Sequence, residues 1–333
     1  MLVTSVFALM VFGPMSPHVA AFLWCVMCAY VVIVAYKEGV LARLGDATLR
    51  SDLTFLGLPT TDAYSFADVA RHFTWTTDLD GFVLETVFGA GGHTKLKGGV
   101  SSLSLVSREL SVAKTTSVLD IGCGRGFCTL TLAGEKPDVC FTGIDLVPRH
   151  VQVARSVMCE NAVFLRADAM RFLSTAIHGF DVVYGIDSLR YMDTQLRLKN
   201  FMWRCKNALR PGGRLVIIDI FRADNFEAAP RDQQAAMRLA EGGMRIEQMP
   251  SKAQWKFEAN RQGLRLAAEE DLTTKALPFW TQLWRIARVV HRLGLIWWLP
   301  KETVANLASM AAMAHAMRQR AAAEYGLLVF VVD

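Results

Sequence analysis

VLDIGCGRG, residues 118–126, is the part of the chain from which its architecture is easiest to infer. An apolar run ends at Asp120 and leads into glycines at three alternate positions, Gly122, Gly124 and Gly126. Glycines at such a turn leave out Cβ atoms, so backbone amides can approach a ligand at the start of the following helix. The stretch therefore predicts a strand, a ligand-binding turn and a helix.

Similar apolar runs recur from residue 117 to residue 333, separated by amphipathic segments. The first five are near-continuous, as strands buried on both faces of a sheet should be. The runs are SVLDIG (117–122), VCFTGIDL (139–146), AVFLRAD (162–168), FDVVYGID (180–187), RLVIIDIF (214–221), GLRLAAEED (263–271) and YGLLVFVVD (325–333). They predict an α/β fold with a doubly wound, mostly parallel, seven-stranded sheet. Helical inserts are expected at about 223–260 and 278–322.

Two further acids stand where strands are expected to end. Asp145 closes the second run, 25 residues after Asp120, and can accept hydrogen bonds from both hydroxyls of a ribose. Asp168 closes the third run and can either accept the amino group of an adenine or cap the next helix. A dinucleotide-binding fold would favour G-x-G-x-x-G without a leading acid. The order of these acids predicts a nucleoside-containing cofactor.

Over about residues 100–225 the chain resembles class I S-adenosylmethionine-dependent methyltransferases. The stretches that match the successive motifs of that family are VLDIGCGRG, GIDLVP, ADAM and LRPGGRLVIIDIF. GLRLAAEEDLTTKALPFW extends the resemblance toward sterol side-chain and tocopherol-type lipid methyltransferases. The resemblance implies a Rossmann-like methyltransferase fold and S-adenosylmethionine as cofactor, with Ile144 flanking it. The cofactor-binding residues that it implies are Asp120, Gly122, Cys123, Gly124, Asp145, Leu146, Asp168, Ala169 and Gly185.

The sequence also departs from those relatives. Sterol and cyclopropane-forming enzymes carry a glutamate and a histidine after the fourth strand, where this chain has Arg190 and Tyr191. The aromatic-rich sterol signature ahead of the glycine turn is replaced by FGAGGHTKLKGG, residues 88–99. The wider family is therefore indicated, and a sterol substrate is not.

Methyl transfer from a sulfonium requires alignment of the acceptor and exclusion of water, and a base only where the acceptor must lose a proton. The candidate catalytic residues are Asp187, Tyr191 and His93. Asp187 follows the fourth strand and is a candidate base or an ordinary loop acid, while Tyr191 can bind the acceptor or shape the pocket. His93 lies among glycines that are typical of a mobile lid. It either has a chemical role in such a lid or is simply a solvated side chain. No histidine has metal-ligand spacing, so no metal is expected.

Residues 19–36 form a run of eighteen uncharged residues, enough to cross about 27 Å of hydrocarbon. Lys37 follows this run and no Lys or Arg precedes it, so a single-pass anchor with the catalytic domain on the cytoplasmic side is predicted. A helical hairpin and a cleaved signal peptide are the alternatives. The expected organisation is a membrane anchor at 1–37, a helical lid or substrate region at 38–110 and the methyltransferase domain at 111–333.

Residues 283–298 have a basic amphipathic pattern. Arg285, Arg288 and Arg292 share one predicted helical face, and Leu283 and Ile286 lie on the other. Such a helix either lies in the membrane interface or packs on the core, and the pattern favours neither.

The composition agrees with a lipid-associated enzyme. Hydrophobic residues make up 52% of the chain and the net charge is +5, without a Lys/Arg-rich run interleaved with aromatics, so nucleic acid is not an expected partner. Seven cysteines, an odd number, favour a reducing compartment. We expect a membrane-anchored methyltransferase acting on a lipophilic acceptor such as a sterol, isoprenoid quinone, tocopherol-like phenol or other lipid. A small polar amine, acid or thiol acceptor is one alternative, and a catalytically silent scaffold or lipid-binding subunit is another.

Overall fold

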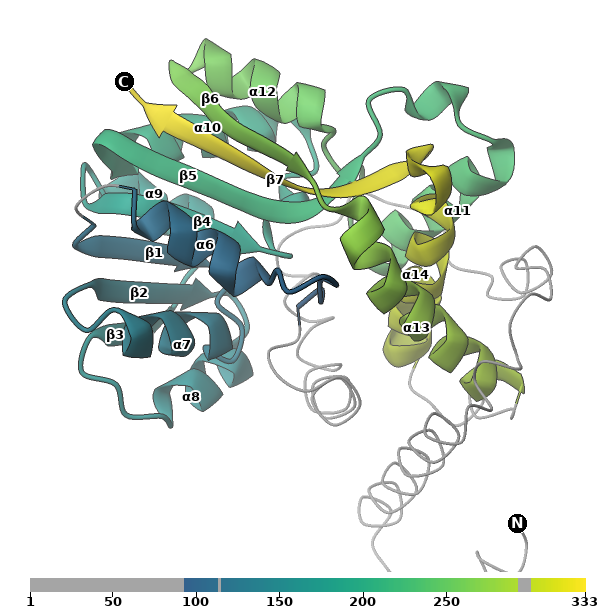
Figure 1. The fold of residues 1–333 in the computed structure, drawn as a ribbon, viewed down its shortest axis with the longest axis horizontal. Helices are drawn as coiled ribbons and strands as arrows, with labels where there is room; N and C mark the ends of the chain where they lie inside the picture. The colour runs from purple at the N-terminus through teal and green to yellow at the C-terminus, as the bar shows by residue number, and fades with distance from the viewer. Residues whose placement is uncertain (1–92, 113–114, 293–300) are drawn as a thin grey trace, which may run out of the picture.

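A computed structural model describes residues 93–112, 115–292 and 301–333 of the protein. Its centre is a seven-stranded sheet in the order β3-β2-β1-β4-β5-β7-β6 (Figure 1). The strands are β1 (Ser117–Ile121), β2 (Cys140–Asp145), β3 (Ala162–Arg166), β4 (Phe180–Ile186), β5 (Leu209–Arg222), β6 (Leu264–Asp271) and β7 (Ala323–Val332). Strands β1 to β5 pair in parallel, and β7 runs antiparallel to both β5 and β6. The predicted doubly wound, mostly parallel sheet is confirmed.

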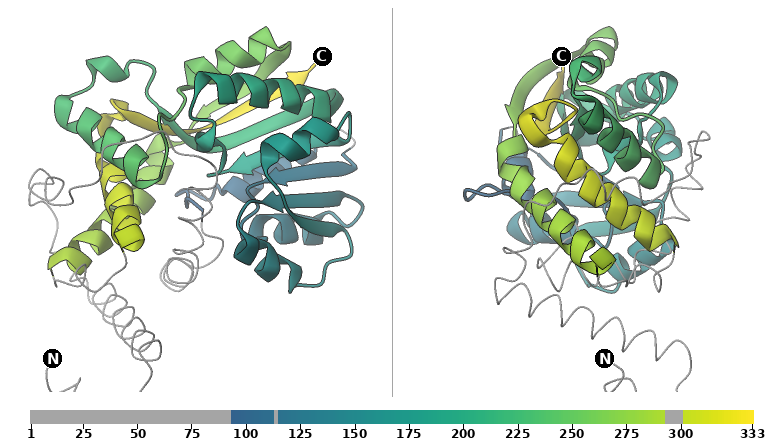
Figure 2. Two further views of the ribbon diagram at one scale, coloured as in Figure 1. Left: turned by 180° about the vertical axis from the view of Figure 1, so that it is seen from behind. Right: turned by 90° about the vertical axis from the view of Figure 1, so that its right-hand side faces the viewer.

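Helices cover both faces of the sheet, as Figures 1 and 2 show. One face carries α6 (Ser102–Leu110), α7 (Phe127–Glu135) and α8 (Pro148–Arg155). The other carries α9 (Ala169–Thr175), α10 (Gln195–Ala208) and α12 (Lys252–Arg261). Both layers bury apolar side chains against the strands, which places the sheet in the middle of the core.

Helix α6 belongs to this layered fold rather than to a separate lid. Its Leu105 and Val106 are buried in one cluster with Val182 of β4 and Val216 of β5. The sheet thus covers the apolar face of α6, while most of the predicted lid or substrate region at 38–110 lies outside the described residues and its boundary stays a prediction.

The two inserts supply a helical group at one end of the sheet (Figure 1). It consists of α11 (Arg231–Gly243), α13 (Thr273–Arg292) and α14 (Lys301–Ala316), and both α11 and α13 pack on α14. The first insert also contains α12, which packs on β6 in the sheet layers. The second begins at Thr273, before the expected start at 278, and Pro278 lies inside α13.

Helix α13 packs on the protein along its described half. Leu283 and Ile286 are buried, and so is Arg288, which is 5% exposed and has its guanidinium 4.9 Å from the ring centre of Trp284. Arg288 therefore does not share a solvated face with Arg285, and the core-packed interpretation holds for residues 283–288. No helix within the described ranges is long and apolar enough to cross a bilayer. The predicted anchor at 19–36 lies outside those ranges.

Candidate functional site

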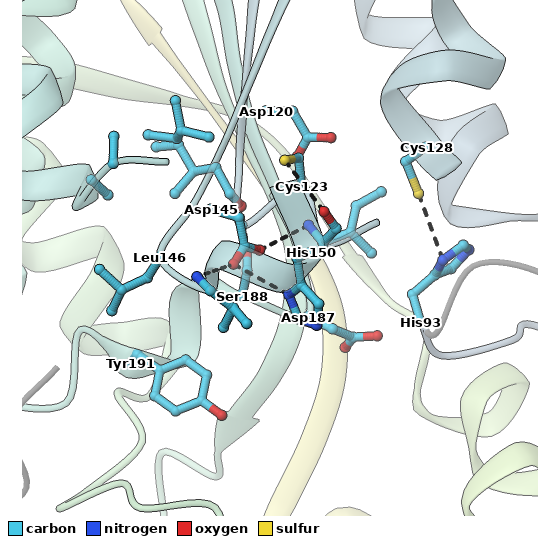
Figure 3. A pocket seen from close by; sticks show the side chains of 18 of the residues that line it. His93, Asp120, Cys123, Cys128, Asp145, Leu146, His150, Asp187, Ser188 and Tyr191 are labelled. Carbon is cyan, nitrogen blue, oxygen red and sulfur yellow. Dashed lines mark hydrogen bonds and ion pairs between the residues drawn. The ribbon is translucent and has the colours of Figure 1, made fainter. Parts of the chain in front are cut away.

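The carboxyl ends of β1 to β4 surround a cavity, the position where open α/β sheets bind ligands (Figure 3). Eleven of the twelve predicted catalytic and cofactor-binding residues line it, and so does Ile144. The eleven are His93, Asp120, Gly122, Cys123, Gly124, Asp145, Leu146, Asp168, Ala169, Asp187 and Tyr191. Gly185 does not belong to the lining. It lies within β4, where an added Cβ would stand 2.5 Å from Cγ of Leu189, so this glycine serves packing.

The glycine turn is held against the second strand. The amides of Gly122 and Cys123 both donate to the carbonyl of Ile144, at 2.8 and 3.0 Å. Gly122 has a φ of +74°, and a Cβ there would lie 2.4 Å from Cβ of Ser188. Gly124 has a φ of +54°, but a Cβ there would meet nothing within 4 Å. Gly122 is thus required for packing, whereas Gly124 keeps the space beside the turn open for a ligand.

The two glycines should respond differently to alanine. Gly122→Ala should lower the free energy of unfolding by about 2–4 kcal/mol, because it combines a left-handed backbone with overpacking against Ser188. Gly124→Ala should lower the free energy of unfolding by about 1–2 kcal/mol, because only the left-handed backbone is strained, but it should also weaken cofactor binding. Urea unfolding and calorimetric titration measure both quantities. Equal losses of stability would contradict this assignment.

Asp145 organises the site from the end of β2. Its Oδ2 accepts the amide of Gly124 at 2.9 Å, and its Oδ1 accepts the amide of Val147 at 2.8 Å. Nδ1 of His150 lies 3.3 Å from the same Oδ1. A carboxylate has about four lone-pair sites, so Oδ2 keeps acceptor capacity toward the cavity that Asp145 lines.

These residues fit a nucleoside cofactor. Asp145 can accept from ribose hydroxyls, and the open space beside Gly124 lets the backbone approach a bound group. Asp168 accepts the amide of Arg171 through Oδ1 at 2.9 Å and so caps α9, while it also lines the cavity. The two roles weighed for Asp168 are therefore compatible, since its second oxygen is available for an adenine amino group.

Asp120 lies beneath the glycine turn and is 3% exposed. Its Oδ2 accepts the hydroxyl of Thr129 at 2.6 Å and that of Tyr184 at 2.7 Å. Burial raises the pKa of Asp120 to about 6; the two hydroxyls oppose this shift and the nearby Asp145 adds to it. Asp120 therefore ties β1, β4 and α7 together under the cavity.

The raised pKa of Asp120 predicts a pH-dependent stability difference between the protein and Asp120→Asn. Between pH 4 and 6 the folded state holds this proton and the unfolded state has lost it, so stability from Asp120 falls as the pH rises. The amide variant lacks this titration. From pH 4 to pH 7, the free energy of unfolding of Asp120→Asn should rise by on the order of 3 kcal/mol relative to that of the unmodified protein, as measured by urea unfolding. A constant difference across that range would show that Asp120 titrates normally.

At the other side of the cavity, residues 93–97 are tied to the end of β4. The amide of Thr94 donates to Oδ2 of Asp187 at 2.6 Å, and the amide of Lys97 donates to the carbonyl of Lys275 in α13 at 3.0 Å. Figure 3 shows the Asp187 carboxylate directed toward the side from which His93 comes. Residues 93–97 thus bridge β4 and α13 across the cavity.

Asp187 is part of a buried ion-pair network. Its Oδ1 lies 3.1 Å from Nη2 of Arg190, whose Nε lies 3.1 Å from Oδ1 of Asp219. Asp219 also accepts the amides of Leu189 and Arg190, which fixes the 3₁₀ turn η1 (Leu189–Tyr191). Asp187 has a φ of +54°, a strained conformation that this network maintains. Oδ2 is therefore hydrogen-bonded to the amide of Thr94, while Oδ1 is ion-paired with Arg190 but accepts no hydrogen bond from the described residues.

Two further polar groups that line the cavity keep their protons. Burial raises the pKa of the Tyr191 phenol and of the Cys128 thiol well above their usual ranges. Sγ of Cys128 lies 3.6 Å from Nδ1 of His93 (Figure 3), and the centre of the Phe127 ring lies 6.0 Å from that of the His93 ring. Of the candidate catalytic residues, His93 is therefore the best placed to accept a proton, and Tyr191 is suited to donate a hydrogen bond.

Several lining residues escaped the sequence analysis. His150 contacts Asp145 from the first turn of α8, and its place five residues after that acid was the available signal. Ser188 donates to the carbonyl of Ile121 at 2.6 Å, and Phe127 and Cys128 come from the start of α7. These three have no motif of their own, because their roles depend on contacts across the sheet.

Comparison with known proteins agrees with this geometry. Residues 113–266 match the model of a family described as a methyltransferase domain. The 27-O-demethylrifamycin SV methyltransferase of Amycolatopsis mediterranei is 29% identical over 170 residues, 50% of this chain and 60% of the relative. The O-methyltransferase cnsE of Penicillium expansum is 38% identical over 120 residues, 34% of this chain and 42% of the relative. The chain thus spans about half the length of these curated relatives.

Solved structures share the fold. The geranyl diphosphate C-methyltransferase from Streptomyces coelicolor, in complex with Mg²⁺, geranyl diphosphate and S-adenosyl-L-homocysteine, superposes with a TM-score of 0.56. The alignment covers 82% of this chain and 100% of that one, at 14% sequence identity. At this identity the likeness concerns the arrangement of helices and strands, including those that carry the cavity.

Proposed function

Because the chain belongs to the class I S-adenosylmethionine-dependent methyltransferases, we propose that it transfers the methyl group of this cofactor to an oxygen atom of a small, largely apolar molecule. The names of both curated relatives described above point to an oxygen acceptor. The narrower resemblance to sterol and tocopherol-type enzymes stays a prediction.

The observation that carries this proposal is the pairing of a histidine with apolar walls. His93 contacts Cys128 and lies beside Phe127, and apolar residues such as Ile186 line the same cavity. Apolar walls favour an apolar acceptor and exclude water from the reacting atoms. An imidazole among them can take the proton of a hydroxyl, a step that an oxygen acceptor requires and a tertiary amine or thioether does not.

The cofactor supplies an activated methyl group on a sulfonium, and the protein supplies position and proton transfer. Asp145 and the glycine turn would hold the nucleoside, with Asp168 and Ala169 beside the base. In the tautomer whose Nδ1–H faces Cys128, Nε2 of His93 carries the lone pair that takes the hydroxyl proton. The amide of Thr94, bound to Asp187, keeps His93 at the cavity.

We further propose that residues 19–36 anchor the protein in a membrane, with the catalytic domain on the cytoplasmic side. The proposal rests on the eighteen uncharged residues and on Lys37, which directly follows them. Such an anchor would hold the enzyme at the bilayer, in which an apolar acceptor dissolves.

The proposal is tested with the detergent-solubilised full chain, S-adenosylmethionine labelled on its methyl group, and an extract of the source organism. After the reaction the extract is divided into organic and aqueous phases. We expect label in the organic phase, and none with Asp145→Ala. Label confined to the aqueous phase would favour a polar acceptor, and cofactor binding without label in either phase would favour a silent scaffold.

A further inference from the structure

A second cleft lies on the face of the sheet covered by α10 and α12. It is bordered by the start of α10, by residues 247–250 and by α12. Met192 lines both this cleft and the cofactor cavity, so the two are neighbours with a common wall. His93, Asp145 and Asp187 do not line the cleft.

A buried carboxylate without hydrogen-bond donors faces this cleft. Glu258 of α12 is 2% exposed and lines the cleft, and among the described residues neither of its oxygens has a hydrogen-bond partner. The nearest cation is Nη1 of Arg261, 3.7 Å from Oε1, on a side chain that is 49% exposed. A buried carboxylate in this state is costly, since neither water nor donors replace its hydration.

The other charges of the cleft do not compensate Glu258. Asp193 is occupied, since its Oδ1 pairs with Arg197 and its Oδ2 accepts the amide of Glu247 at 2.9 Å. Glu247 itself stands exposed at the rim. No Lys or Arg is among the described residues that line the cleft, so its lining carries only negative formal charge.

The rest of the lining is partly apolar. Leu198 and Pro250 form buried walls, and Phe257 is 58% exposed at the border, where the guanidinium of Arg261 lies 5.6 Å from its ring centre. A ligand that fits must donate hydrogen bonds to Glu258, carry positive charge and present an apolar body to these side chains.

We propose that this cleft binds an organic cation, an ammonium or guanidinium group attached to an apolar or aromatic body, with its N–H groups donated to Glu258. This site is separate from the methyl-transfer site, and the proposal does not depend on the proposed function.

Benzylamine is a suitable probe, and benzyl alcohol is its uncharged counterpart of the same shape. In calorimetric titrations of the full chain we expect saturable binding of benzylamine, at least about tenfold tighter than benzyl alcohol. Glu258→Gln should weaken benzylamine binding by roughly 10- to 100-fold. The matched control at the rim, Glu247→Gln, should change it by no more than about twofold. S-adenosylhomocysteine should not displace the amine.

A stability measurement separates ligand binding from a structural role of Glu258. Without ligand, Glu258→Gln should unfold at the same urea concentration as the unmodified protein or at a higher one, because it removes a buried charge that accepts no hydrogen bond from the described residues and is paired with the half-exposed Arg261 at 3.7 Å. A destabilised variant would mean that a partner within the protein satisfies Glu258, and would overturn the proposal. Equal binding of amine and alcohol, unchanged binding in Glu258→Gln, or displacement by S-adenosylhomocysteine would do so too.

Discussion

Asp145→Ala should weaken the binding of S-adenosylhomocysteine by roughly 100-fold or more. The substitution removes the acceptor for the ribose hydroxyls and releases the amides of Gly124 and Val147, which Asp145 holds at 2.9 and 2.8 Å. The turn would then lose the shape that receives the cofactor. Isothermal titration of both proteins with S-adenosylhomocysteine measures the effect, and circular dichroism establishes that the variant is folded.

Asp181→Ala is a control for this experiment. Asp181 lies at the opposite end of β4, where its carboxylate binds the amides of Thr116 and Ser117 and the guanidinium of Arg210. Its loss should lower stability but leave cofactor affinity within about twofold, since none of its partners lines the cavity. If the folded Asp145→Ala protein bound S-adenosylhomocysteine as tightly as the Asp181→Ala control, the cofactor site would have to lie elsewhere.

His93→Gln should lower the rate of methyl transfer by about 100- to 10,000-fold, the usual contribution of a general base. Glutamine keeps a polar group beside Cys128 but cannot accept the hydroxyl proton. S-adenosylhomocysteine binding should stay within about threefold, since Asp145 and the glycine turn are unchanged. Single-turnover incorporation of labelled methyl into the organic extract measures the rate.

Asp187→Asn distinguishes the base from the residue that positions it. The amide oxygen of asparagine can still accept from Thr94, so His93 should remain near its place. We expect a loss of about tenfold, with a raised KM as the bridge between β4 and α13 loosens. Full activity in His93→Gln together with loss in Asp187→Asn would assign the proton transfer to Asp187.

Much of the fold could be predicted because its signals are local. The five parallel strands are near-continuous apolar runs. A predicted acid lies at or near the carboxyl end of each of β1, β2 and β3, namely Asp120, Asp145 and Asp168. Carboxyl ends of parallel strands meet at one edge, so the order of the acids also predicted their proximity.

Features that depend on distant partners could not be predicted in this way. Thr94 and Asp187 are separated by 93 positions, and no periodicity relates them. The amphipathic pattern of α13 placed Arg288 with Arg285, yet Arg288 is buried against Trp284 because α13 is packed within a helical group. Gly185 resembled a cofactor-binding glycine, but the contact that requires it is the approach of Leu189.

The central claim is that this protein places a methyl group on an oxygen atom. Its most direct test uses S-adenosylmethionine with a trideuterated methyl group, the organic extract as acceptor source, and mass spectrometry and NMR of the purified product. The account predicts one CD₃ group bonded to oxygen in place of a hydroxyl proton, and no such product with Asp145→Ala or His93→Gln. A CD₃ group bonded to nitrogen, sulfur or carbon would contradict it.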